Sequence, residues 1–157
     1  MKSCLSLIVV LCLASGLWIG ADAQFRQDLC TDGWIHYGCN CFKYFGEQKT
    51  WADAEHFCLG QGGNLASIHN NLEHNFVRRL IKSASGRDDK VYVGGHDRYK
   101  EGKWSWSDGK NFVFPGWHKG EPNNNGGNED CMELNFHNAG NDIPCHLRRA
   151  FVCSRPV

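Results

Sequence analysis

Side chains that carry oxygen donors gather in three nearby segments of the sequence. These are Glu121-Pro122-Asn123, Asn128-Glu129-Asp130-Cys131 and Asn141-Asp142-Ile143-Pro144-Cys145. Carboxylates and uncharged amides are hard donors, and they suit a hard cation such as Ca²⁺. If Cys131 and Cys145 form a disulfide, Glu129 and Asn141-Asp142 lie close together on opposite sides of it. The pattern therefore predicts a calcium site built from three segments.

The rest of the chain predicts a mixed α+β domain that must position these donors. Thr50 is typical of a helix N-cap, and Gly62-Gly63 is typical of a helix end. Apolar residues recur at helical spacing from Leu72 to Ser83, which predicts a second helix. The segment from Asp108 to Asn128 is rich in glycine, asparagine and proline, so we expect a long, ordered, functional loop. Strands are predicted in segments 28–45, 91–95, 103–107, 132–136 and 150–153.

The composition bounds the class of protein. The chain has 157 residues, enough for one domain, and its 41% hydrophobic content allows a packed core. The formal net charge is zero, which does not favour nucleic acid or an anionic membrane as a partner. His69 and His74 lack the spacing of a zinc helix, and no nucleophile and base can be argued from the residue order. We therefore predict a binding protein and not an enzyme.

The N-terminal segment has the features of a signal peptide. Lys2 precedes an apolar run from Leu5 to Leu13, and Ala21-Asp22-Ala23 is a small-x-small cleavage signal. The alternative is a membrane anchor, but the apolar run is too short to span a bilayer comfortably. We expect residues 1–23 to be a signal peptide, residues 24–157 to form the mature domain, and the protein to be secreted without membrane insertion.

Cysteine content agrees with secretion. After removal of residues 1–23, seven cysteines remain, an odd number. In an oxidising compartment they should form disulfides and leave one thiol over. Their number alone does not determine the pairing. They are Cys30, Cys39, Cys41, Cys58, Cys131, Cys145 and Cys153.

Several independent motifs, in order from Cys30 to Cys153, resemble the long form of the C-type lectin carbohydrate-recognition domain. The three donor segments resemble the calcium and sugar motifs of that family. Val91-Tyr92-Val93-Gly94-Gly95 stands where the family has its Trp-Ile-Gly-Leu strand. The other matches are Cys30-Thr31-Asp32-Gly33-Trp34 with Cys41, Trp51-Ala52-Asp53-Ala54 with Cys58, Gly63-Asn64-Leu65-Ala66-Ser67-Ile68, and Phe151-Val152-Cys153.

The resemblance implies an α+β fold with two helices, two small antiparallel sheets and a long calcium-binding loop. It also implies three disulfides, Cys30–Cys41, Cys58–Cys153 and Cys131–Cys145. Cys39 has no partner in this pattern. Three alternatives follow: Cys39 is a free thiol, it forms an interchain disulfide in a homodimer, or it replaces Cys41 as the partner of Cys30.

The same resemblance implies one calcium ion that also binds sugar hydroxyls. Its ligands would be Glu121, Asn123, Glu129, Asn141 and Asp142, with Pro122 in the cis form. The order Glu-Pro-Asn goes with mannose-type ligands in the family, and Gln-Pro-Asp goes with galactose. This chain departs from the family at Gly140, where a tryptophan is usual. We expect this glycine to leave Asn141 and Asp142 less supported.

Further expectations follow from the resemblance. A second calcium would be held by Asp97, Glu101, Asn124 and Asp130. The partners would be mannose-type glycans on microbial surfaces, in innate defence. Two alternatives remain open on the same fold. One is an ice-binding protein similar to type II antifreeze proteins, although the expected site is polar and threonine is scarce after Thr50. The other is a secreted toxin-like subunit that has lost sugar binding, which the intact donor set argues against.

Overall fold

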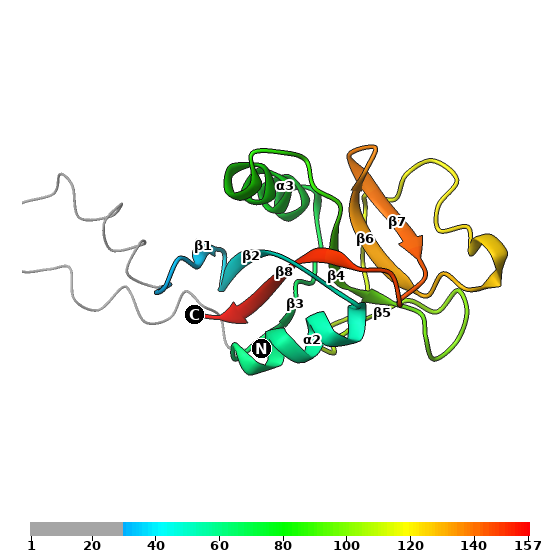
Figure 1. Ribbon diagram of the computed structural model, residues 1–157, viewed down its shortest axis with the longest axis horizontal. Coiled ribbons are helices and arrows are strands. Elements are labelled where there is room, and N and C mark those ends of the chain that lie inside the picture. Colours follow the sequence, from blue (N-terminus) through cyan, green and yellow to red (C-terminus); the bar gives the residue numbers. More distant parts are fainter. Residues whose placement is uncertain (1–29) are drawn as a thin grey trace, which may run out of the picture.

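The computed structural model describes residues 30–157, and the expected signal peptide with its cut after Ala23 lies outside the described residues. Figure 1 shows two helices, a twisted sheet and a long loop at one end. The helices are α2 (Trp51–Gly60) and α3 (Asn71–Ser85), with a 3₁₀ turn at Asn125–Gly127. The strands are β1 (Ile35–Tyr37), β2 (Asn40–Lys49), β3 (Asn64–Leu65), β4 (Val91–His96), β5 (Ser105–Trp106), β6 (Cys131–Phe136), β7 (Ala139–Ile143) and β8 (Arg149–Pro156).

Local side-chain chemistry sets the helix boundaries. The Thr50 hydroxyl accepts a hydrogen bond from Asp53 N at 3.3 Å, so α2 begins after Thr50 as predicted. Helix α3 is slightly longer than predicted, because Asn70 caps it through Glu73 N at 2.9 Å. Gly86 ends α3 in the left-handed region at φ 76°, a conformation that glycine adopts without steric cost.

The strands form one continuous sheet, so the expectation of two separate antiparallel sheets is wrong. The main order is β1-β2-β8-β4-β6-β7, with β3 and β5 as short additional pairings. Most neighbours are antiparallel, but β4 runs parallel to β8, with Val91 opposite Ala150 and Tyr92 opposite Phe151. This parallel pair joins the two halves into one mixed sheet.

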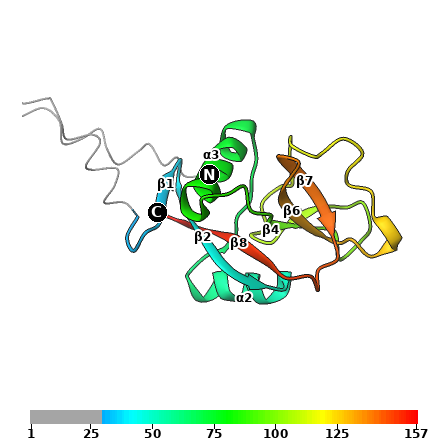
Figure 2. The ribbon, with the colours of Figure 1, turned by 45° about the horizontal axis from the view of Figure 1, so that its top comes forward.

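The two helices cover opposite faces of this sheet (Figures 1 and 2). Side chains alternate between the faces along each strand, so each face builds its own core. Tyr92 and Phe151 pack with Trp51 of α2, whereas Val91 and Val93 share a cluster with α3. All four of these strand residues are fully buried. The sheet is therefore held rigidly between α2 and α3, and it supports the loop at its end.

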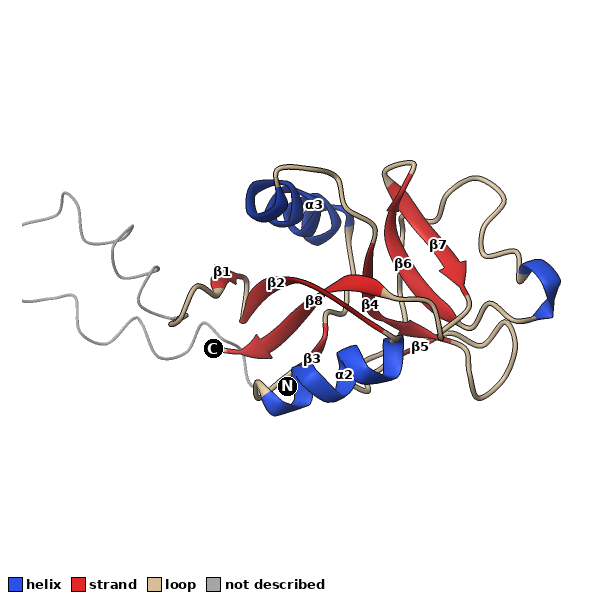
Figure 3. Cartoon of the chain, viewed as in Figure 1, coloured by secondary structure: helices blue, strands red, loops and turns tan. Residues whose placement is uncertain are grey.

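All three predicted disulfides are present. Cys30 pairs with Cys41, Cys58 with Cys153, and Cys131 with Cys145. Cys39 is an exposed free thiol in the turn between β1 and β2, so it does not replace Cys41. Figure 3 shows a long loop segment between β5 and β6. The Cys131–Cys145 bridge ties the start of β6 to the segment after β7, next to this loop.

Candidate calcium and carbohydrate site

Asp142 is the centre of the predicted site. It lies on β7 opposite Met132 of β6, and only 1% of its surface is exposed. Its two carboxylate oxygens accept hydrogen bonds from consecutive backbone amides of the long loop, Asn123 N at 3.1 Å and Asn124 N at 2.7 Å. The Glu121–Pro122 peptide bond is cis, as predicted. The structure thus brings the Glu-Pro-Asn segment directly against the Asn-Asp segment.

Glu121 and Asn123 lie side by side across Pro122. Asn123 Nδ2 donates to Glu121 Oε1 at 3.0 Å. The other carboxylate oxygen, Oε2, is buried and has no hydrogen-bond partner in the described residues. Burial raises the pKa of Glu121, and the adjoining Asp142 carboxyl and the charge of Glu129 raise it further. A carboxylate that has one oxygen buried beside two other carboxylates is stabilised if a cation lies between them.

Glu129 reaches the same region from the end of the loop. Its Oε2 atom accepts a hydrogen bond from Asn125 N at 2.7 Å, and its own backbone amide donates to Asn124 Oδ1 at 3.1 Å. Burial is the main cause that raises the pKa of Glu129, and the charge of Asp142 adds to it. Glu129 and Asp142 are therefore electrostatic neighbours, as the donor pattern predicted.

Asn141 is held by a residue that the sequence did not single out. Asn141 Nδ2 donates to Glu133 Oε1 at 3.3 Å, directly across the β6–β7 pair. Glu133 is 1% exposed, and its other oxygen accepts from Arg149 Nε at 2.7 Å. Since Glu133 takes the amide nitrogen, the amide oxygen Oδ1 is left without a hydrogen bond in the described residues. Glu133 lies within a buried strand, so no local motif marks it.

Gly140 does not leave the gap that the sequence predicted. A Cβ atom at this position would lie 2.6 Å from Phe114 Cε1 and 2.9 Å from Met132 Cε. The Phe114 ring, which comes from the long loop, thus occupies the space beside Gly140. The backbone is also fixed on both sides, because Gly140 N donates to Gly116 O at 2.7 Å and Gly140 O accepts from His118 N at 2.9 Å. The expectation of poor support was therefore wrong. It could not foresee that Phe114, which is distant in sequence, packs against Gly140.

The residues expected at a second calcium form an adjoining acidic group. Asp97 is 2% exposed, and its Oδ1 atom is buried without a partner in the described residues. Its Oδ2 atom accepts from Gly102 N at 2.8 Å. Asn124 Nδ2 donates to Glu101 Oε2, and Asp97 N donates to Asp130 O at 3.2 Å. Burial is the largest cause that raises the pKa of Asp97, and the charge of Asp130 adds to it. Glu101 is exposed, and local desolvation and the charges of Asp97 and Asp130 raise its pKa.

The two groups together contain six carboxylates, and within residues 30–157 none of them forms an ion pair with a lysine, arginine or histidine. They are Asp97, Glu101, Glu121, Glu129, Asp130 and Asp142. In the same part of the chain, no three Asp, Glu, His or Cys side chains are arranged to hold a metal ion by themselves. A cation here would therefore also need the amide oxygens of Asn123 and Asn141. This mixed donor set fits calcium, which binds six to eight oxygens and accepts neutral amides.

Comparison with known proteins identifies the family. The sequence profile described as "Lectin C-type domain" matches residues 47–155. This chain belongs to the C-type lectin domain family. Its relatives are lectins, which are not enzymes, and so it is not an enzyme. Within the described residues, no helix has both the length and the apolar content to cross a bilayer.

Individual relatives in this family carry different names. "Galactose-specific lectin nattectin" from Thalassophryne nattereri is 44% identical over 149 residues, which cover 94% of this chain and 94% of that protein. "C-type lectin mannose-binding isoform" from Oxyuranus scutellatus is 33% identical over 152 residues, covering 94% of this chain and 95% of that protein. The solved structure of herring type II antifreeze protein has a TM-score of 0.75 and 29% identity, and it covers 82% of this chain and 99% of its own.

Proposed function

We propose that this chain is a secreted, calcium-dependent lectin that binds mannose-type glycans through Glu121, Asn123, Glu129, Asn141 and Asp142. The observation that carries this proposal is the buried, unpartnered oxygen of Glu121 beside the Asp142 carboxyl. A buried carboxylate oxygen without a partner is costly, and a bound cation would remove that cost. The amide oxygens of Asn123 and Asn141 would complete a donor set that fits calcium.

The same residues have the chemistry to recognise sugar hydroxyls. Bound calcium would supply a positive centre with open coordination positions for two neighbouring hydroxyl oxygens. A carboxylate such as Glu121 accepts hydrogen bonds from hydroxyl groups, and an amide such as Asn123 donates to them. The site therefore offers both acceptors and donors to a pair of vicinal hydroxyls. Because Glu121 and Asn123 lie on one loop segment, they would orient the sugar at the protein surface.

Specificity for mannose-type sugars rests on the Glu121-Pro122-Asn123 order. In the family that the chain resembles, this order accompanies mannose, N-acetylglucosamine and fucose. The name of nattectin favours galactose as a second candidate, because that relative is 44% identical to this chain. The name of the Oxyuranus scutellatus relative favours mannose. The order of carboxylate and amide at Glu121 and Asn123 favours mannose, and we propose mannose-type binding on that ground.

A second calcium would be held by Asp97, Glu101, Asn124 and Asp130. The buried, unpartnered Oδ1 atom of Asp97 supports this assignment. The mutual repulsion of these carboxylates also favours a bound cation. Since Asn124 also donates its backbone amide to Asp142, the second ion would support the loop that carries the first.

Valency would come from a disulfide-linked homodimer. Cys39 is an exposed free thiol at the tip of the β1–β2 turn, so a second copy can reach it. Single lectin sites bind weakly, and two linked sites gain avidity on a surface that carries many glycans. A microbial cell surface is such a target, and secretion would deliver the protein to it. Innate defence is the role that this combination supports.

Calcium-dependent chromatography tests this proposal. The mature chain is applied to immobilised mannose and immobilised galactose, each with calcium and with EDTA. We expect retention on mannose in calcium, elution by EDTA, and weaker retention on galactose. Stronger retention on galactose would overturn the mannose assignment, and no retention on either resin would overturn the lectin assignment. A thermal-hysteresis measurement on the same sample tests the ice-binding alternative that the herring structure raises, and we expect none.

A further inference from the structure

A polar cavity of about 370 Å³ opens beside the central strands, near the beginnings of β4 and β8. The parallel register places Val91 opposite Ala150, so Lys90 and Arg149 lie next to each other just before these two residues. On the other side of β8, the pairing of β2 is interrupted between Phe45 and Lys49. This irregular stretch of β2 forms one wall of the cavity, and the segment after α3 forms another.

Positive charge predominates in this cavity. Arg87, Lys90, Arg148 and Arg149 line it, and Asp89 is the one acidic residue among the lining residues. Asp89 is fully occupied, because its Oδ2 atom accepts from the Tyr44 hydroxyl at 2.8 Å and its Oδ1 atom pairs with Arg87 at 3.1 Å. Asp89 therefore positions Arg87 and does not compete for a ligand.

Glu133 is the other carboxylate near these cations, and it lies behind the cavity. It is 1% exposed and pairs with Arg149 Nε at 2.7 Å and with Lys90 Nζ at 3.8 Å. When Asp89 and Glu133 are both counted against the four cations, the lining still has an excess of two positive charges. An excess of this size inside a concave surface attracts a dianion.

Arg148 and Lys90 have the donors that are free for such a ligand. Arg148 Nη2 donates to Gln48 O at 2.6 Å, which holds the guanidinium at the cavity wall. Its remaining nitrogens have no hydrogen-bond partner, and no carboxylate pairs with it, within residues 30–157. The Lys90 side chain is 46% exposed; its Nζ lies 3.8 Å from Glu133 Oε1 and 4.8 Å from the centre of the Phe136 ring, and it makes no short hydrogen bond to a side chain in the described residues. An arginine and a lysine that line the same cavity suit the oxygens of a phosphate or sulfate group.

We propose that this cavity binds a phosphate or sulfate ester carried by a saccharide. The volume is at the lower end of the range of ligand pockets, which is about 300–1,000 Å³, so it admits a charged group and one sugar ring. An extended polyanion is disfavoured because the whole chain has no net charge. Lys90 in the cavity and Asp97 lie at opposite ends of β4, seven residues apart, which is about 23 Å at 3.3 Å per residue. The anion site and the second calcium site therefore lie at opposite ends of β4, whereas Glu133 lies between the cavity cations and Asn141.

Nuclear magnetic resonance titration of the mature chain in EDTA tests this proposal independently of calcium-dependent sugar binding. The probes are N-acetylglucosamine 6-sulfate, uncharged N-acetylglucosamine and inorganic phosphate. We expect saturable shifts of the amides around Lys90 and Arg148 with the sulfated sugar, weaker ones with phosphate, and none with the uncharged sugar. Equal affinity for the sulfated sugar and phosphate would overturn the saccharide part of the proposal. No saturable shift with either anion would overturn all of it.

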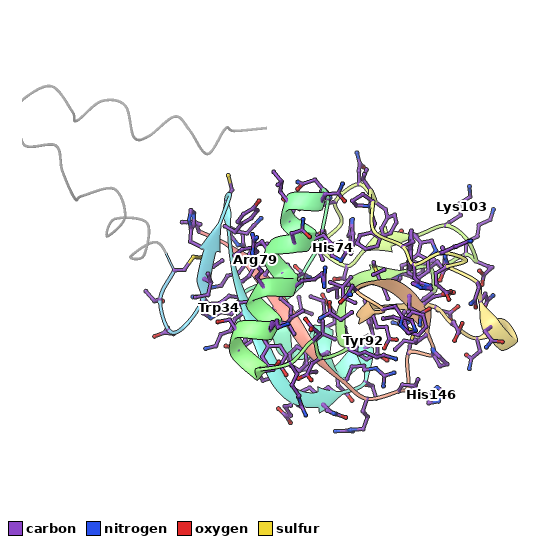
Figure 4. The ribbon with its side chains drawn as sticks, turned by 90° about the horizontal axis from the view of Figure 1, so that it is seen from above. Trp34, His74, Arg79, Tyr92, Lys103 and His146 are labelled. Carbon is purple, nitrogen blue, oxygen red and sulfur yellow. A yellow bond between two sulfur atoms is a disulfide. The ribbon has the colours of Figure 1, made fainter. Side chains whose placement is uncertain are left out.

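A pair of variants locates the site. The double variant Lys90→Gln, Arg148→Gln removes the two cations that have donors available to a ligand, and it leaves Arg149 in place because Arg149 makes the short bond to Glu133. The control, Arg79→Gln with Lys103→Gln, removes an exposed arginine and an exposed lysine from other surfaces (Figure 4). We expect affinity for the sulfated sugar to fall at least about tenfold in the first variant, because two charged contacts are lost. In the control it should fall less than about twofold. Equal losses in both would show non-specific charge attraction and overturn the proposal.

Discussion

Glu133 and Asn141 face each other across the β6–β7 pair, and Asn141 Nδ2 donates to Glu133 Oε1 at 3.3 Å. This bond determines which end of the Asn141 amide is free. The nitrogen is used inside the sheet, so the oxygen is the atom that remains for a metal. Glu133 therefore positions Asn141, a proposed calcium ligand, without being a calcium ligand itself.

Replacement of Glu133 by glutamine tests this relationship. The structure uses both carboxylate oxygens, Oε2 for Arg149 and Oε1 for Asn141, but glutamine has only one acceptor oxygen. Glu133→Gln should weaken calcium binding by about 10-fold, measured by calorimetry, which is typical for loss of a partner behind a metal ligand. It should also lower the free energy of unfolding by about 1–3 kcal/mol. Glu47→Gln is the control, because Glu47 is exposed and should change neither; unchanged calcium affinity in Glu133→Gln would contradict the positioning role.

Exchange of the two residues around Pro122 tests the sugar preference. Glu121→Gln with Asn123→Asp keeps the size of both side chains and reverses the order of carboxylate and amide. We expect the ratio of mannose to galactose affinity to fall by at least about tenfold, since acceptors and donors change places around the sugar hydroxyls. Competition for an immobilised glycan by the two free sugars gives this ratio. If the ratio does not change, the order of these residues does not set the specificity.

Calcium binding should weaken in mild acid. Burial raises the pKa of Glu121 and of Glu129, and neighbouring carboxylates raise both further. A carboxyl with a raised pKa takes up a proton at higher pH as the solution is acidified, and the neutral form is a poor calcium ligand. The affinity for calcium should therefore be highest at neutral pH and should fall at least about tenfold as the pH is lowered to about 5.

Calorimetry of calcium binding at a series of pH values measures this dependence. Far-UV circular dichroism at the same pH values is the control, because it distinguishes loss of the ion from unfolding. A calcium affinity that is flat down to about pH 5, with the fold intact, would contradict participation of Glu121 and Glu129.

That the candidate donor segments lie close together could be predicted from sequence because each segment is contiguous. Glu121-Pro122-Asn123 and Asn141-Asp142 are short motifs, and the chain brings them together through the bonds from Asn123 N and Asn124 N to Asp142. The start of α2 was also predictable, since Thr50 caps it locally. Features of this kind need only neighbours in the sequence.

Long-range packing was not predictable in the same way. The single sheet depends on the parallel pairing of Val91 with Ala150, which lie far apart in sequence and carry no pairing signal of their own. The support for Gly140 comes from Phe114, and the support for Asn141 comes from Glu133. A glycine in sequence shows only that a side chain is missing. It does not show which distant side chain occupies the space.

Cys39 offers a test of valency. Cys39→Ser removes the free thiol and leaves the three disulfides intact. Wild-type mature protein should show a dimer band on a non-reducing gel, and the variant should show only monomer, with weaker agglutination of mannan-coated beads because two-site avidity is lost. The control is wild-type protein treated with reductant under native conditions. Its single-site affinity for mannose should equal that of Cys39→Ser. A dimer band that persists in Cys39→Ser would show that the contact is made elsewhere.

The close contact at Gly140 gives the most direct test of how the loop supports the site. Gly140→Ala places a methyl group 2.6 Å from Phe114 Cε1 and 2.9 Å from Met132 Cε, so these side chains or the backbone before Asn141 must shift. Overpacking of this kind costs about 1–3 kcal/mol of unfolding free energy, and we expect calcium affinity to fall as well.

Gly60→Ala is the matched control for this test, because Gly60 lies in α2 with open space around its Cβ position, where alanine should stabilise the helix slightly. Thermal unfolding and calcium calorimetry on both variants measure the two effects separately. If Gly140→Ala loses neither stability nor calcium affinity, Phe114 yields without cost, and the loop does not brace Asn141 and Asp142 as the structure indicates.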